Sequence, residues 1–240
     1  MLRIALAALA MLAASACSYG SAVNLAPMSA RLSNPVIGPG DYCEVKGEAA
    51  PFIVAHEDCA PITWDQATRT YTLVDPDKED GHDESIQSAV ISLGSGLYAA
   101  QIDTTADKDG ASHRSADRYQ LEVLFAQGNA FAMIPPLDDD ALRMLTKRHA
   151  QLKFKNDPAG RPYIAAGSAD RIKAFLRDAA QTSLGLIKER KDEDRDKLSI
   201  GVLDAGGAGE HPANDQQTKD IEAILKLAKS MTPDWSAAPH

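Results

Sequence analysis

The sequence of 240 residues is poor in aromatic side chains, which make up 5% of it, and it has no tryptophan-rich run. Such a composition disfavours a carbohydrate-binding platform, which needs exposed rings. Positive charge is also scarce, because 25 Lys and Arg residues stand against 34 Asp and Glu residues. The net charge of −9 disfavours binding to nucleic acid or to anionic lipid through charge alone.

Long apolar runs are missing except at the N-terminus, where Ile4 to Ala14 is apolar throughout and follows the positive charge of Arg3. This run is typical of a signal peptide. It is too short for a membrane-spanning helix, which needs about 20 apolar residues. We therefore expect Met1 to Ala16 to be removed on export, leaving a mature net charge of 24 − 34 = −10 once Arg3 is gone.

The segment Ala14-Ser15-Ala16-Cys17 resembles the lipobox of bacterial lipoproteins, although Ala14 stands where that family usually has Leu. The resemblance implies cleavage before Cys17 and a lipid on its sulfur. Plain secretion after the small residues, and an uncleaved anchor, are the alternatives. In Gram-negative bacteria, Ser18 after the lipidated cysteine resembles lipoproteins sent to the outer membrane. The domain would then face the periplasm.

Cysteine is rare, with Cys17, Cys43 and Cys59 alone. Lipidation of Cys17 leaves an even pair, which suits an oxidising compartment. A Cys43–Cys59 disulfide would stabilise the fold by about 3 kcal/mol in the chain-entropy model. Two buried free thiols are the alternative. A metal site is disfavoured because the close ligand pairs of zinc sites are missing.

Period-two alternation between Asp41 and Ile134 predicts short strands joined by tight turns at Gly94-Ser95-Gly96 and Gln127-Gly128-Asn129. These strands predict an antiparallel meander, either a small sandwich or a partly open barrel, in an α+β fold. The clearest strands are Tyr71–Val74, Ala89–Leu93, Leu97–Ile102, Tyr119–Phe125 and Ala130–Ile134, with Phe52–Ala55 and Ile62–Trp64 as further short ones.

Two or three helices follow the meander. Asp138 is placed to cap the first helix and Ser168 the second, and Gln216 to Met231 has an amphipathic pattern. Leu152–Phe154 and Pro162–Ile164 suggest edge strands between the first two helices. The predicted organisation is a signal peptide (1–16), a lipid anchor and flexible tether (17–40), a β-rich domain (41–187) and a charged, flexible C-terminal region (188–240) with a glycine-rich linker from Gly201 to Asn214.

The strongest concentration of metal-ligating oxygens is the acidic loop from Asp75 to Glu84. Its spacing does not fit the twelve-residue calcium loop. We expect a solvated loop, with Asp75, Asp77, Glu79, Asp80 and Asp83 as weak candidates for a divalent ion. Thr105 to Gly110 fails the same test at its first ligand.

No catalytic constellation stands out among the nucleophiles and bases. Gly94-Ser95-Gly96 lacks the five-residue Gly-x-Ser-x-Gly elbow of serine hydrolases and joins two strands. The six histidines are scattered, and His56-Glu57-Asp58 beside Cys59 is the most polar spot near the predicted disulfide. Trp64 and Tyr98 are expected to fill the core. We expect no enzyme, no cofactor and no catalytic residue.

The run from Tyr42-Cys43 through Cys59-Ala60-Pro61-Ile62-Thr63-Trp64 to Tyr119-Gln120-Leu121 resembles small β-rich lipoproteins of Gram-negative bacteria that carry no assigned activity. The resemblance implies location rather than mechanism. Our first hypothesis is a membrane-anchored envelope protein that binds another protein or stabilises an assembly. The alternative is a periplasmic module that binds a ligand or inhibits a hydrolase.

Overall fold

The structure is a computed structural model. It describes residues 19–47, 50–74, 85–104, 118–157, 160–189, 198–204, 206 and 209–231, without the side chains of residues 57, 58, 188 and 189. The elements in chain order are β1 (Tyr19–Ser21), β2 (Gly40–Lys46), β3 (Ile53–Asp65), β4 (Thr70–Val74), β5 (Ser85–Gly94), β6 (Leu97–Asp103), β7 (Tyr119–Gln127), β8 (Ala130–Ile134), α2 (Asp139–Arg148), β9 (Lys153–Asn156), β10 (Pro162–Ala166), α3 (Ala169–Glu189), β11 (Ser199–Leu203), β12 (Glu210–Pro212) and α4 (Asp215–Met231).

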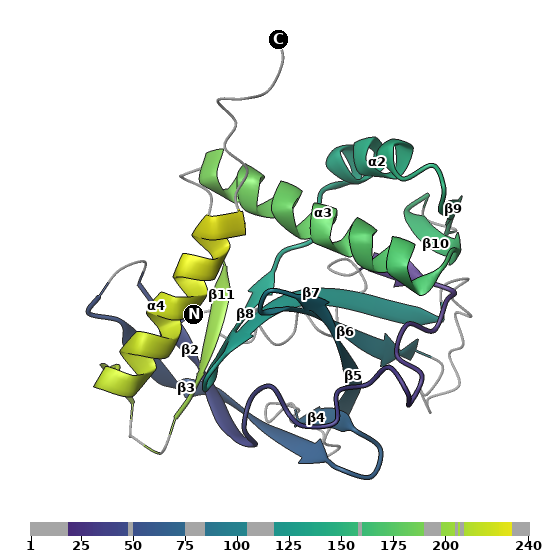
Figure 1. The fold of residues 1–240 in the computed structure, drawn as a ribbon. Coiled ribbons are helices and arrows are strands. Elements are labelled where there is room, and N and C mark those ends of the chain that lie inside the picture. The colour runs from purple at the N-terminus through teal and green to yellow at the C-terminus, as the bar shows by residue number, and fades with distance from the viewer. Residues whose placement is uncertain are drawn as a thin grey trace.

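Eight of these strands close into an antiparallel barrel, in the order β2-β3-β4-β5-β6-β7-β8-β11 (Figure 1). The two pairings that complete the ring are β6 with β7 and β11 with β2. The predicted α+β class with an antiparallel sheet is therefore confirmed. Of the two predicted arrangements the barrel is the one formed, and it is closed rather than partly open.

Both predicted tight turns are present. Gly94, Ser95 and Gly96 have φ angles of 97°, 54° and 75°, and Gly128 has a φ of 60°. Residues with positive φ suit two-residue hairpin loops because their twist matches that of the flanking strands. Local turn chemistry thus fixes two hairpins, β5–β6 and β7–β8.

The predicted strands Phe52–Ala55 and Ile62–Trp64 are two parts of one long strand, β3. Its pairing with β2 is interrupted, because Cys43 lies opposite Cys59 while the next residue, Glu44, lies opposite Ala55. The residues between them are extra and bulge from the ladder, and such a bulge breaks the period-two pattern. The sequence pattern therefore showed two strands where the chain forms one.

The linker predicted from Gly201 to Asn214 was wrong at two places. Residues 199–203 form β11, which lies between β2 and β8 in the barrel wall, and residues 210–212 form β12 on β3. Glycine weakens a strand in general, but Gly201 has a packing role. A Cβ atom there would lie 2.7 Å from the ring of Phe131, so the aromatic side chain needs the glycine.

The structure also differs from the predicted flexible tether. Tyr19 to Ser21 pair with β7 and β10, and the side chains of Leu25 and Ala26 are buried. Their backbone amides donate hydrogen bonds to Oε1 of Gln101 at 2.6 and 3.2 Å. Residues 22–39, which contain the prolines, form no helix or strand, but they still pack against the barrel.

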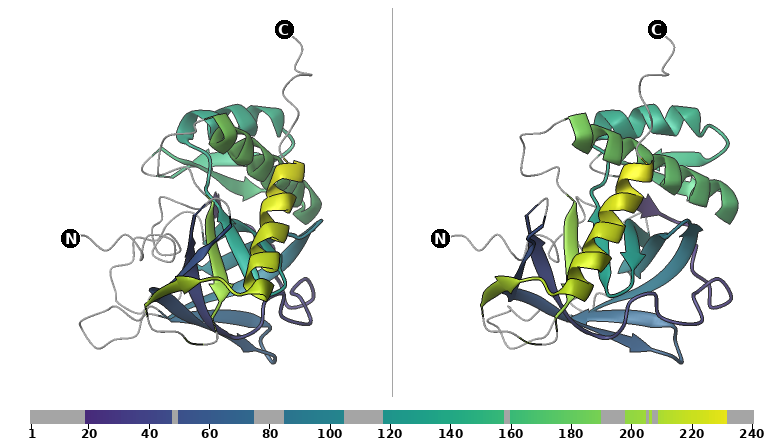
Figure 2. Two further views of the ribbon diagram at one scale, coloured as in Figure 1. Left: turned by 90° about the vertical axis from the view of Figure 1, so that its left-hand side faces the viewer. Right: turned by 60° about the vertical axis from the view of Figure 1, so that its left-hand side comes forward.

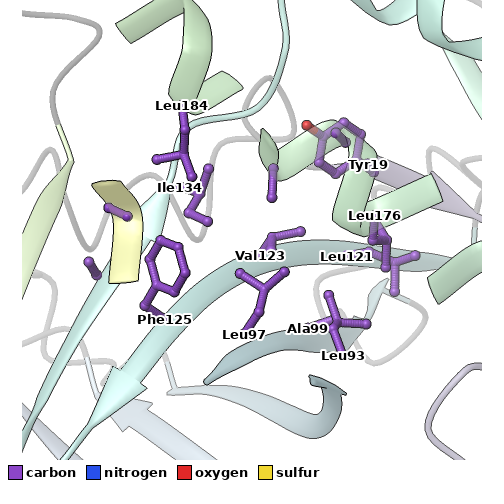
Figure 3. Close-up of a cluster of buried hydrophobic side chains, with 14 of the residues drawn as sticks. Tyr19, Leu93, Leu97, Ala99, Leu121, Val123, Phe125, Ile134, Leu176 and Leu184 are labelled. Atoms are coloured by element: carbon purple, nitrogen blue, oxygen red, sulfur yellow. The ribbon is translucent and has the colours of Figure 1, made fainter. Parts of the chain in front are cut away.

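Helices α3 and α4 cover the outside of the barrel (Figures 1 and 2). The outward-facing residues of β5 to β8 form one apolar cluster with them, as the side chains of Leu97, Val123, Phe125, Leu176 and Leu184 show (Figure 3). Asp138 caps α2 as predicted, since its side chain accepts a hydrogen bond from the amide of Ala141. The strands β9 and β10 extend the sheet beyond β1.

The amphipathic helix predicted near the C-terminus returns to the barrel as α4. Ile221 and Ile224 are fully buried. Asp220 fastens the helix to the β7–β8 turn, because its Oδ2 accepts a hydrogen bond from the amide of Asn129 at 3.0 Å and its Oδ1 accepts one from Nε2 of Gln216 at 2.9 Å.

We expect Asp220→Ala to lower the free energy of unfolding by about 1–3 kcal/mol, because it leaves a part-buried backbone amide without its acceptor. The measurement is urea denaturation of wild type and variant. Glu222→Ala, at an exposed position of the same helix, is the matched control and should change stability by less than about 0.5 kcal/mol. Equal midpoints for Asp220→Ala and the control would contradict this account of how α4 docks.

Candidate functional site

One cluster of apolar side chains contains residues from all eight strands of the wall, and it therefore marks the inside of the barrel. Because side chains alternate between the two faces of a strand, the register then tells which other residues point inward. The cluster consists of Ile37, Tyr42, Ala60, Ile62, Tyr71, Leu73, Val90, Ala100, Leu124 and Ala126, with Trp64, Tyr98, Phe131, Met133 and Leu203 partly buried against them.

One half of the interior is apolar and is closed by the chain that precedes β2. Tyr71 accepts a hydrogen bond from the amide of Val36 at 2.6 Å, and Tyr42 donates one to the carbonyl of Gly38 at 2.9 Å. The ring centroids of Trp64 and Tyr71 lie 4.7 Å apart. Trp64 and Tyr98 pack against this cluster as predicted for core residues, but both are half-buried.

The other half of the interior contains a buried carboxyl group, that of Glu122. Glu122 lies opposite Ala100 and two residues before Leu124, so it points inward with them. It is 5% exposed, and its Oε2 has no hydrogen-bond partner among the described residues. Burial raises the pKa of Glu122 to about 8, so the carboxyl group carries a proton at neutral pH.

Further polar residues face inward near the same ends of the strands. Ser88 lies opposite Ile102 and Tyr71, Gln120 opposite Ile102, and Ser199 opposite Met133. Glu44 lies opposite Gly201. We call the set of Glu44, Ser88, Gln120, Glu122 and Ser199 the polar half of the barrel.

Four members of the polar half are half-buried, and Glu122 alone is buried. The wall of a closed barrel is continuous, so water reaches inward-facing side chains through its ends. At the other end, residues 32–37 pack across the opening. The four half-buried residues thus lie toward one end of the barrel, while Glu122 lies deeper inside. An eight-stranded barrel is just wide enough to be filled by side chains or to hold one small ligand.

Sequence analysis predicted the strand Tyr119–Phe125 but did not single out Glu122 as a site residue. Strand β7 is buried on both faces, by the helices outside and by the barrel inside. The one sequence feature that could have indicated a buried carboxyl group is the position of Glu122 between Leu121 and Val123 in a strongly apolar strand. The sequence could not show which face of the strand points into the barrel, because that depends on the closure of the sheet.

The predicted disulfide between Cys43 and Cys59 is present. It lies on the outer face, because Cys43 belongs to the cluster under the helices. Four other predictions lie outside the described residues: the signal peptide 1–16, lipidation of Cys17, the acidic loop with Asp75, Asp77, Glu79, Asp80 and Asp83, and the segment Thr105–Gly110.

The chain matches no protein-family model, no curated protein and no solved structure. Within the part of the chain that the structure describes, no helix combines the length and apolar character needed to cross a bilayer.

We expect the stability of the protein to fall between pH 4.5 and pH 8 because of Glu122. In that range the unfolded chain releases the proton, since the ordinary pKa of Glu is 4.5, while the folded state keeps it up to about pH 8. The folded state thus binds more protons, and its stability drops by on the order of 4 to 5 kcal/mol across the range.

Urea denaturation at several pH values, compared between wild type and Glu122→Gln, measures this contribution. The variant should lose the Glu122-dependent slope and gain stability relative to wild type as the pH rises. The control Glu222→Gln should keep the wild-type slope. Parallel pH profiles for wild type and Glu122→Gln would show that Glu122 titrates normally.

Proposed function

We propose that this protein is a non-enzymatic binding module of the cell envelope that holds a small amine-bearing molecule in the polar half of its barrel. The observation that carries the proposal is Glu122, a buried carboxyl group whose Oε2 has no hydrogen-bond partner among the described residues. A buried polar group without a partner lowers stability by about 1–3 kcal/mol. Such a cost is explained if a ligand completes the site.

An ammonium group is the partner that fits this surrounding best. Two of the five residues of the polar half are acidic and none is basic, and the whole chain carries a net charge of −9. A cation in contact with Glu122 would favour its charged form and drive the proton off the carboxyl group. The apolar residues beside it, Ile102 and Met133, would contact the carbon skeleton of the ligand.

This proposal follows the second of the two hypotheses drawn from the sequence. The first, a protein-binding or structural role, used the sheet and the C-terminal amphipathic helix as the binding surface. That apolar face is buried against the barrel, with Ile221, Ile224 and Ala228 packed in the outer cluster. An envelope protein partner stays a prediction, but the apolar face of this helix is not exposed to bind it.

The proposed location is the periplasmic face of the outer membrane, with a lipid on Cys17 as the anchor. Strand β1 begins at Tyr19, two residues after Cys17. Two residues span at most about 7 Å. A lipid on Cys17 would therefore hold β1 at the headgroups instead of on a long tether.

Native mass spectrometry of the full-length protein, extracted from its own membrane in a mild detergent, tests the ligand directly. We expect an additional mass of one small amine that dissociates on activation. Glu122→Gln should carry no such mass, whereas Glu222→Gln should carry it. A bound molecule without a basic nitrogen, or the same mass on both variants, would contradict the proposal.

Binding of hexylammonium, a simple amine probe, should depend on pH in a defined direction. The carboxylate form of Glu122 is the one that pairs with the probe, so affinity should rise from pH 6 to pH 9 while the probe stays charged. Titration calorimetry should show about one proton released per probe bound at pH 7. Hexanol is the neutral control, and equal affinity for both compounds would argue against a charge-pairing site.

A further inference from the structure

A second group of chemically active side chains lies on the outer face of the barrel, away from Glu122. Cys43, His56 and Cys59 place their Sγ and imidazole nitrogen atoms within 4.8 Å of one another. Nδ1 of His56 lies 3.6 Å from Sγ of Cys59. Cys43 is fully buried, while His56 and Cys59 are half-buried at the edge of the group.

The bulge in β3 creates this arrangement. Cys59 pairs with Cys43 and Ala55 pairs with Glu44, so the residues from His56 to Asp58 are left out of the ladder. The bulge returns His56 to the sulfur of Cys59, three residues away. In a regular strand, the side chains of His56 and Cys59 would point to opposite faces. The sequence spacing therefore did not indicate a close pair of ligands.

The same nitrogen of His56 also contacts Asp204, just after β11. Oδ2 of Asp204 lies 3.0 Å from Nδ1 of His56, and the side chain of Asp204 is 5% exposed. A nucleophile–base–acid relay does not fit here, because Cys59 and Asp204 both contact the same nitrogen. Such a relay uses the two ring nitrogens for different partners.

We propose that reduction of the Cys43–Cys59 disulfide converts this group into a binding site for a zinc ion. Cys43, Cys59 and His56 would supply two sulfurs and one nitrogen. Thiolate and imidazole are the ligands that zinc prefers. Tetrahedral bonds of about 2.3 Å to sulfur and 2.0 Å to nitrogen separate neighbouring ligand atoms by roughly 3.5–3.8 Å. The 3.6 Å between Cys59 and His56 already lies in that range.

The chemistry balances with a dithiol as the reductant. The dithiol transfers two electrons and two protons to the disulfide, so the S–S bond breaks, two thiols form, and the dithiol becomes a disulfide. Zinc then displaces both thiol protons into solvent, because thiolates are the ligands. Two thiolates and one dication give a neutral group. Zinc on Nδ1 of His56 would replace the contact of that nitrogen with Oδ2 of Asp204, whose negative charge would then lie beside the metal group. The fourth position is left to water.

Cobalt(II) titration of the full chain tests this proposal, with Cys17→Ser as the background so that two thiols remain. After reduction by a phosphine, we expect one cobalt per chain and a near-ultraviolet charge-transfer band from thiolate to metal. The oxidised protein should give no band, and zinc should displace the cobalt. His56→Ala should weaken cobalt binding at least about tenfold, and His240→Ala should leave it unchanged.

Circular dichroism shows whether the reduced protein is folded, so that loss of the site can be told from loss of the fold. A folded, reduced protein that gives no band would overturn the proposal. So would a reduced protein that unfolds and is not refolded by cobalt, or a band of equal affinity in His56→Ala. None of these results bears on Glu122, because the two sites lie on opposite faces of the wall.

Discussion

Closure of the sheet is the constraint on which the rest of this structure depends. The ladder between β6 and β7 and the insertion of β11 between β8 and β2 turn a meander into a barrel with an inside. Once the wall is closed, a carboxyl group on β7 is cut off from water. Burial then raises its pKa to about 8. The unusual chemistry of Glu122 is thus a consequence of topology, not of a charged neighbour.

Strand β2 shows how a single element serves both sites. Tyr42 and Glu44 point into the barrel, while Cys43 between them points outward and bonds to Cys59. The alternation of a strand keeps the two chemistries on separate faces. The disulfide can therefore change its redox state on the outer face, while the polar half is built from the other set of side chains.

Local signals in the sequence predicted the parts of the fold that depend on neighbouring residues. The hairpin at Gly94 to Gly96 and the cap at Asp138 follow from short-range chemistry, whereas the pairing of Cys43 with Cys59 was predicted from the number of cysteines. Strand β11 could not be predicted in the same way, because it joins partners more than 60 residues distant along the chain. The pairs His56–Asp204 and Asn129–Asp220 likewise join distant segments. The inward direction of Glu122 follows from the register of β7 with β6 and from the closure of the sheet, which β11 completes.

The most direct test of the account is a carbon-13 NMR titration of the glutamate side chains, with Glu122→Gln used to assign the resonance of Glu122. The barrel interior predicts that this carboxyl carbon titrates with a pKa of about 8. A value near 4.5, the ordinary pKa of a glutamate, would show that Glu122 is in contact with water and would remove the basis of the proposed ligand site.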